Sequence, residues 1–187
     1  MPPRVNGYRN DNGWSNHMST ATAKAKFKGN DMTIEGGQPQ VGDKAPDFQL
    51  TANDLSPRRL SDYAGKVKII SVVLSLDTST CDNQTRAFNE KASQLSDDVA
   101  ILTVSVDLPF AQKRWCGAAG IERVECLSDY KDHNFGRNWG RIQELGLLAR
   151  AVYVVDKDDV IRHVEKPADL SQEPDYEPVL EAVKKLV

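Results

Sequence analysis

A short run of β-branched residues that ends in helix-capping residues constrains the fold more than any other stretch of the chain. Residues 67–76 read VKIISVVLSL, a run too short to cross a membrane and typical of a strand buried on both faces, as in a parallel sheet. Thr78, Ser79 and Thr80 follow, and all three favour the N-terminus of a helix. Beyond them one stripe of residues has helical spacing. Its members are Cys81, Thr85, Phe88, Ala92 and Leu95.

Cys81 opens that stripe, in the first turn of the predicted helix. A thiol there lies near unpaired backbone N–H groups and the positive end of the helix dipole, and both favour the thiolate, which is the nucleophilic form. The alternative is a small buried residue without chemistry, because free cysteines are among the most buried of all residue types. The local sequence alone leaves both interpretations open.

The order of the predicted elements indicates an α/β fold. Residues 99–106 form a second buried strand, and the order strand, helix, strand implies a right-handed parallel crossover. Hairpins are predicted near both ends of the chain, over 25–35 with a turn at Gly29-Asn30-Asp31, and over 150–165 with a turn at 156–159. From Tyr176 the apolar spacing predicts a C-terminal amphipathic helix that packs on the sheet.

Two shorter helical segments are predicted between the second strand and the second hairpin. Pro109 suits the first turn of a helix that runs from Phe110 to Cys116 and stops at Gly117. A helix this short, held by few apolar contacts, is expected to open locally. Residues 132–139 predict a broken helical segment that is interrupted by Gly136.

The length of 187 residues suits one domain with a sizeable core. Residues 1–23 are rich in Asn, Gly, Ser and Arg and lack apolar periodicity, so we expect a disordered tail followed by a single domain over 24–187. Residues 17–20 (HMST) look like a cloning junction, and the residues up to about 17 are therefore expected to be vector-derived.

Charge and cysteine usage exclude several classes of protein. The formal net charge of −3 gives no reason to expect a nucleic-acid or membrane partner. No secretory signal is recognisable, so a cytoplasmic location is expected. Three cysteines do not suggest a secreted disulfide framework, and Cys-x-x-Cys is absent. The spacing of Cys81, Cys116, Cys126 and His133 matches no zinc site, so neither a metal nor another cofactor is expected.

Several motifs resemble those of the peroxiredoxins, and more narrowly those of the thiol peroxidases, which are atypical two-cysteine enzymes. The active-site loop corresponds to Ser75-Leu76-Asp77-Thr78-x-x-Cys81. The other similar segments follow in the family's order. They are 41–48 (VGDKAPDF), 86–90 (RAFNE), 107–116 (DLPFAQKRWC), 127–130 (LSDY) and 147–152 (LLARAV). The resemblance extends from about Lys26 to the C-terminus.

The resemblance implies a thioredoxin-like fold with the peroxiredoxin additions and an N-terminal β-hairpin. It also implies a thiol-dependent peroxidase that reduces hydrogen peroxide and organic hydroperoxides, is recycled by thioredoxin and forms homodimers. Cys81 would be the peroxidatic cysteine, which becomes a sulfenic acid. Arg150 would be the cation beside it, and Thr78 a hydrogen-bond donor to the sulfur and the peroxide. Cys116 would be the resolving cysteine of an intrasubunit disulfide.

Each of these residues also has a structural interpretation. Arg150 could be a surface arginine at a strand end, and Thr78 an ordinary helix cap. Cys126 is expected in the core of a strand and is given no catalytic role.

Leu74 departs from the family pattern, which has proline at this position. Leucine keeps the apolar bulk but restores a backbone N–H and frees φ, so we expect the activity to be retained with a changed rate or substrate preference. The alternative function is a non-enzymatic redox sensor of the same fold, with peroxidase activity weakened by Leu74. A thioredoxin-fold module with inert cysteines is the third interpretation.

Overall fold

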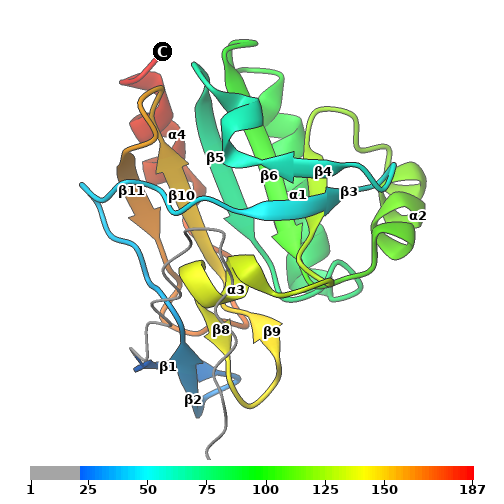
Figure 1. Cartoon of the computed structure of the whole chain (residues 1–187), viewed down its shortest axis with the longest axis vertical. Coiled ribbons are helices and arrows are strands. Elements are labelled where there is room, and N and C mark those ends of the chain that lie inside the picture. Colours follow the sequence, from blue (N-terminus) through cyan, green and yellow to red (C-terminus); the bar gives the residue numbers. More distant parts are fainter. Residues whose placement is uncertain (1–21) are drawn as a thin grey trace, which may run out of the picture.

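The computed structural model describes residues 22–187, which form two sheets and four α-helices (Figure 1). The larger sheet has the strand order β11-β10-β5-β6-β7-β3-β4, and the smaller has the order β1-β2-β8-β9. The strands are β1 (Thr22–Phe27), β2 (Asn30–Glu35), β3 (Gln49–Ala52), β4 (Pro57–Arg59), β5 (Val67–Val72), β6 (Val99–Ser105), β7 (Glu125–Ser128), β8 (Arg141–Ile142), β9 (Leu147–Leu148), β10 (Ala151–Val155) and β11 (Ile161–Glu165). The helices are η1 (Leu60–Tyr63, a 3₁₀ helix), α1 (Ser79–Ala92), α2 (Pro109–Ala119), α3 (Asn134–Trp139) and α4 (Tyr176–Lys184).

The predicted crossover forms the centre of the larger sheet. β5 pairs with β6, and β6 pairs with β7, in parallel, and the other pairs of this sheet are antiparallel. Every residue of β5 is buried, because the strand lies between β10 and β6 and side chains cover both of its faces. The order β5, α1, β6 confirms the α/β prediction.

Apolar layers cover both faces of the larger sheet. On one face Ile69 packs with Phe88 of α1 and Val179 of α4. On the other face Ile70 belongs to a cluster that includes Phe135 of α3. Within residues 22–187, no helix combines the length and the apolar character that crossing a membrane would need.

The N-terminal hairpin is present, with a tighter turn than predicted. β1 begins at Thr22, so the last two residues of the predicted tail belong to the strand. The turn contains only Lys28 and Gly29, at φ 51° and 78°, and Phe27 pairs with Asn30. Two positive φ values give a twist that matches the flanking strands. The predictions for the rest of the tail, including its vector origin, lie outside the described residues.

The predicted end of α2 is wrong. The helix continues through Gly117 and ends at Gly120, which adopts the left-handed conformation with φ 65°. Only two of its side chains, Pro109 and Gln112, are buried. α2 packs against β7, and both of its buried side chains lie in its first turn.

The predicted interruption at Gly136 is also wrong, because α3 runs through this residue. The N–H of Gly136 donates to Asp129 Oδ2 at 2.9 Å, and a Cβ at this position would lie 3.1 Å from Leu148 Cδ2. Gly136 therefore allows α3 to pack closely against Leu148 and does not break the helix.

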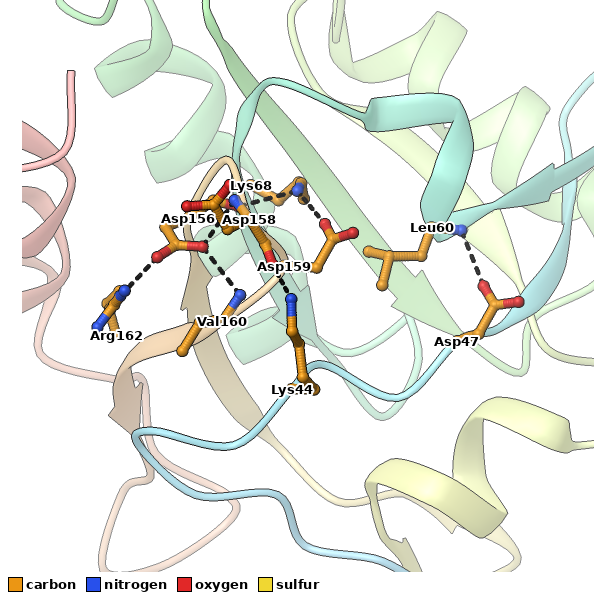
Figure 2. Close-up of polar contacts among 9 residues, drawn as sticks. All are labelled: Lys44, Asp47, Leu60, Lys68, Asp156, Asp158, Asp159, Val160 and Arg162. Carbon is orange, nitrogen blue, oxygen red and sulfur yellow. Dashed lines mark hydrogen bonds and ion pairs between the residues drawn. The ribbon is translucent and has the colours of Figure 1, made fainter.

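A buried lysine anchors the second hairpin to the central strand (Figure 2). Lys68 of β5 is fully buried, donates to the carbonyl of Asp156 at 2.9 Å and pairs with the carboxylate of Asp159. The hairpin of β10 and β11 was predicted, and Ala151 pairs with Val72 at the end of β5. The pairing of Ala151 with Val72 sets the position of Arg150, the residue that precedes β10.

Candidate active site

Cys81 is the third residue of α1, just beyond the carboxyl end of β5. Thr78 is the N-cap, with φ −100° and ψ 142°. The side chain of Cys81 is fully buried, and its carbonyl accepts a hydrogen bond from the Thr85 hydroxyl at 2.9 Å. The predicted strand-to-helix junction is confirmed, and it places the sulfur inside the domain.

Arg150 brings a guanidinium to the sulfur of Cys81. Its Nη2 donates to Cys81 Sγ at 3.2 Å, its Nε donates to the Leu170 carbonyl at 2.9 Å, and its Nη1 donates to Gln84 Oε1. Arg150 is only 2 % exposed. It is therefore not a surface arginine, and its three hydrogen bonds hold the guanidinium in one orientation.

In the described part of the chain, the charge of Arg150 has no carboxylate partner. No Asp or Glu in residues 22–187 lies within ion-pair distance of the guanidinium. A buried cation is costly unless an anion or several hydrogen bonds compensate for its lost hydration. The carbonyl and amide that it contacts are neutral, and only the sulfur of Cys81 can ionise. The sulfur of Cys81 is therefore the group on which this guanidinium can stabilise negative charge.

Gln84 helps to position the guanidinium, and the sequence analysis missed it. The residue is fully buried, accepts from Arg150 through Oε1 and donates through Nε2 to Ser71 Oγ at 2.8 Å. It lies one helical turn after Cys81. The spacing of this glutamine from Cys81 could have indicated its role from the sequence, because a buried amide needs hydrogen-bond partners for both its oxygen and its nitrogen.

The segment that follows β11 covers the start of α1. Leu170 provides the carbonyl that binds Arg150, and the neighbouring Ser171 carbonyl accepts from the Thr80 hydroxyl at 3.1 Å. Asp169 accepts from the N–H of Gly29 at 2.7 Å, which joins this segment to the N-terminal hairpin. Because Cys81 is fully buried, a molecule from solvent cannot contact its sulfur unless the residues around it move.

The structure places the Thr78 hydroxyl against the Ser75 carbonyl and not against the sulfur of Cys81. The Thr78 side chain is exposed, and its hydroxyl donates to the Ser75 carbonyl at 2.9 Å. The hydroxyl thus closes the loop before α1 and does not contact Cys81. Asp107, which the sequence analysis also missed as a site residue, holds the same loop: it accepts from Ser75 Oγ at 2.7 Å and from the N–H of Leu76 at 2.8 Å.

Cys116 contacts Cys126 and not Cys81. It is half-buried near the end of α2, and its Sγ lies 3.2 Å from the Sγ of Cys126 on β7. All three cysteines are free of disulfide bonds. The hydrogen bond with Cys126 lowers the pKa of Cys116 to about 7, whereas the same bond and burial raise the pKa of Cys126. Cys126 is buried in a strand, as predicted.

Leu74 is buried in the loop between β5 and α1. Within the described part of the chain its N–H makes no hydrogen bond, whereas the preceding N–H of Val73 donates to the Val104 carbonyl at 3.0 Å. The backbone here does not use the donor that leucine restores, so the loop is compatible with the proline of the family pattern.

Comparisons with known proteins identify the family. The sequence profile of the family described as Redoxin matches residues 40–180. The thiol peroxidase of Halalkalibacterium halodurans is 55 % identical over 163 residues, which cover 87 % of this chain and 98 % of that protein. The thiol peroxidase of Bacillus subtilis is 49 % identical over 166 residues, which cover 88 % and 99 %. The chain belongs to the thiol peroxidase family.

The fold of a solved structure agrees with this assignment. The crystal structure of a peroxiredoxin-like protein from Aquifex aeolicus has a TM-score of 0.82 and 34 % identity, over 89 % of this thiol peroxidase and 99 % of that chain. The predictions of a peroxiredoxin-type α/β fold and of a thiol-dependent peroxidase are therefore confirmed, and the sensor alternative is not favoured. Within residues 22–187 of this thiol peroxidase, no group of three or more potential metal ligands occurs.

Proposed function

We propose that Cys81 is the peroxidatic cysteine of this thiol peroxidase and that Arg150 activates it. The Cys81 thiolate attacks the terminal oxygen of a hydroperoxide. An S–O bond forms, the O–O bond breaks, and the leaving alkoxide or hydroxide takes up a proton, which leaves a sulfenic acid on Cys81. The 3.2 Å contact between Cys81 Sγ and Arg150 Nη2, without a competing carboxylate among residues 22–187, carries this proposal.

The fork of the guanidinium suits this step. Arginine presents several N–H groups in one plane, so Arg150 can donate to the sulfur and to the peroxide oxygen on which negative charge develops. Gln84 and the Leu170 carbonyl already fix two edges of the group. We assign Thr78 to the shape of the loop, because its hydroxyl is bonded to the Ser75 carbonyl.

Cys116 is the proposed resolving cysteine, which forms an intrasubunit disulfide with Cys81. A disulfide needs Cα atoms within about 7 Å of each other. Both cysteines lie in helices, and Cys116 contacts Cys126 instead of Cys81, so we expect the first turn of α1 and the end of α2 to unwind as the bond forms. The small buried surface of α2, which is limited to Pro109 and Gln112, supports such local opening.

The proposed substrates are hydrogen peroxide and organic hydroperoxides, and the proposed reductant of the disulfide is thioredoxin. A homodimer and a cytoplasmic location belong to the same proposal. Support comes from the resemblance of the motifs to the family and from relatives that carry the name thiol peroxidase.

The test is NADPH consumption in the presence of thioredoxin, its reductase and hydrogen peroxide. We expect steady turnover by the parent and none by Cys81→Ser. Cys116→Ser should also lose turnover but should still form one sulfenic acid, which dimedone traps on Cys81. Asp97→Ala is a control, because this exposed side chain makes no hydrogen bond or ion pair within residues 22–187. A parent that is oxidised by peroxide without turnover would favour the redox sensor.

Peptide mapping tests the disulfide, because the three cysteines fall on separate tryptic peptides. These are 69–86, 115–123 and 124–131. In peroxide-treated protein we expect a link between 69–86 and 115–123 within one chain. A dominant link between two chains, or a Cys81 link to peptide 124–131, would contradict the assignment of Cys116.

A further inference from the structure

We propose that Cys126 is a positioning residue for the resolving step, because its thiol donates a hydrogen bond that keeps Cys116 ionised in the reduced enzyme. This inference rests on the proposed role of Cys116 as the resolving cysteine. For Cys126 itself, the sequence predicted only a place in the core of a strand.

The two sulfurs are in direct contact. The distance of 3.2 Å between Cys116 Sγ and Cys126 Sγ is too long for a disulfide, whose S–S bond measures about 2.05 Å, and it suits a hydrogen bond between a thiol and a thiolate. Bonds of this kind, with one charged partner, are stronger than neutral ones.

Burial decides which sulfur keeps the proton. Cys126 is 2 % exposed, and the negative charges of Asp107 and Glu125 further disfavour its thiolate. Cys116 is half-buried, and Asn53 Nδ2 donates to its sulfur at 3.7 Å. The proton therefore stays on Cys126, which donates, and the charge lies on Cys116.

Apart from the long contact with Asn53, the helix and the charged residues described around Cys116 do not favour a thiolate. The residue lies near the C-terminus of α2, where its carbonyl accepts from Ile121 N–H at 3.1 Å and where the helix dipole disfavours an anion. Its sulfur borders a cavity of about 490 Å³ that also contacts Cys126. The charged residues that line this cavity balance in sign. They are Asp54, Glu122, Glu125, Arg58, Lys66 and Arg123.

The ionised sulfur is the form that resolution consumes. The Cys116 thiolate attacks the sulfur of the Cys81 sulfenic acid, an S–S bond forms, the S–O bond breaks, and hydroxide leaves and takes up a proton from solvent. The Cys126 thiol keeps its own proton. Since only the thiolate reacts, the pH at which Cys116 ionises sets the acid limb of this step.

The pH dependence of Cys116 alkylation by iodoacetamide tests the inference in a Cys81→Ser background, with peptide 115–123 as the readout. We expect an ionisation midpoint near 7 with Cys126 present. Cys126→Ala should move the midpoint toward the free-thiol value of about 8.5, which makes alkylation at pH 7 roughly 15-fold slower. Cys126→Ser keeps a donor and should fall between the two. Equal midpoints for the Cys126 parent and the alanine variant would overturn the inference.

A second measurement separates this inference from the proposed function. In the enzyme that retains Cys81, the rate of Cys81–Cys116 disulfide formation should show the same shift of its acid limb in Cys126→Ala. If the disulfide forms but its pH profile does not move, only the role of Cys126 fails. If the alkylation midpoint moves but no such disulfide forms, the role of Cys116 in the proposed function fails.

Discussion

Trp115 of α2 donates its indole Nε1–H to Asp82 Oδ1 of α1 at 2.9 Å, so the residue before Cys116 is tied to the residue after Cys81. Arg86 reinforces the contact: it pairs with Asp82 at 2.9 Å and lies 5.6 Å from the centre of the Trp115 ring. The first turn of α1 and the end of α2 can unwind, as the proposed disulfide requires, only when this contact breaks.

Asp82→Ala should accelerate disulfide formation. The substitution removes the acceptor of Trp115 and the partner of Arg86, both at partly exposed positions, so we expect about a two- to fivefold faster resolving step. Tryptophan fluorescence in a stopped-flow single turnover with hydrogen peroxide follows this step, with Asp97→Ala as the control. An unchanged or slower rate would show that the contact does not restrain α2.

Arg150→Lys should slow the reaction with peroxide by about 100-fold or more, which is the usual effect of losing one aligned donor to a developing charge. Lysine keeps the charge, but its ammonium cannot donate in one plane to Cys81, Gln84 and the Leu170 carbonyl. The second-order rate of Cys81 oxidation is the measurement, and circular dichroism checks that the variant is folded. A rate within a few-fold of the parent would mean that charge alone is sufficient.

Gln84→Glu tests the claim that the guanidinium needs the thiolate as its anion. The variant is nearly isosteric but places a carboxylate against Arg150, which then competes with Cys81 for the guanidinium, so the peroxide rate at pH 7 should fall by about tenfold. Gln84→Met, which adds no charge, is the matched comparison. Equal rates for the two variants would contradict the electrostatic argument.

Leu74→Pro should raise the second-order rate with peroxide, because proline fixes φ in the loop before Cys81 and the N–H that it removes makes no hydrogen bond within residues 22–187. Leu76→Pro is the control: it removes the 2.8 Å bond from the Leu76 N–H to Asp107 and should lower the melting temperature. If the rate does not change in Leu74→Pro, position 74 does not limit this enzyme.

Asp129 should make stability depend on pH. Its carboxylate accepts from the N–H of Phe135 at 3.0 Å and of Gly136 at 2.9 Å, yet burial raises its pKa to about 6. The folded value exceeds the unfolded value of about 3.9. The stabilising contribution is therefore complete below pH 4 and is lost as pH rises through 6, by about 3 kcal/mol.

Urea denaturation of the parent and of Asp129→Asn between pH 4 and 7.5 measures this contribution. The difference in the free energy of unfolding between parent and variant should fall with rising pH, because asparagine does not titrate in this range. Parallel profiles for the two proteins would assign the pH dependence to other groups.

Local sequence patterns were sufficient to predict the central strand, the helix that follows it and their junction. The β-branched run, the three capping residues and the helical spacing after Cys81 predicted β5, α1 and their junction, because these features act between residues close along the chain. The end of α2 was mispredicted, since Gly117 and Gly120 are equally able to end a helix by residue type and only Gly120 takes a positive φ. The short strands β4, β8 and β9 lack a periodic pattern and were missed.

From its residues alone, the chain could be predicted to begin a helix with a cysteine after a buried strand, and the family motifs then singled out Arg150, Thr78 and Cys116. Which group each of these side chains faces became known from the folded chain: Arg150 contacts Cys81 and is held by Gln84, Thr78 donates to Ser75, and Cys116 contacts Cys126. Most of these contacts join separate elements. Their distances depend on the register of β10 against β5 and on the packing of α2 against β7, which no local spacing specifies.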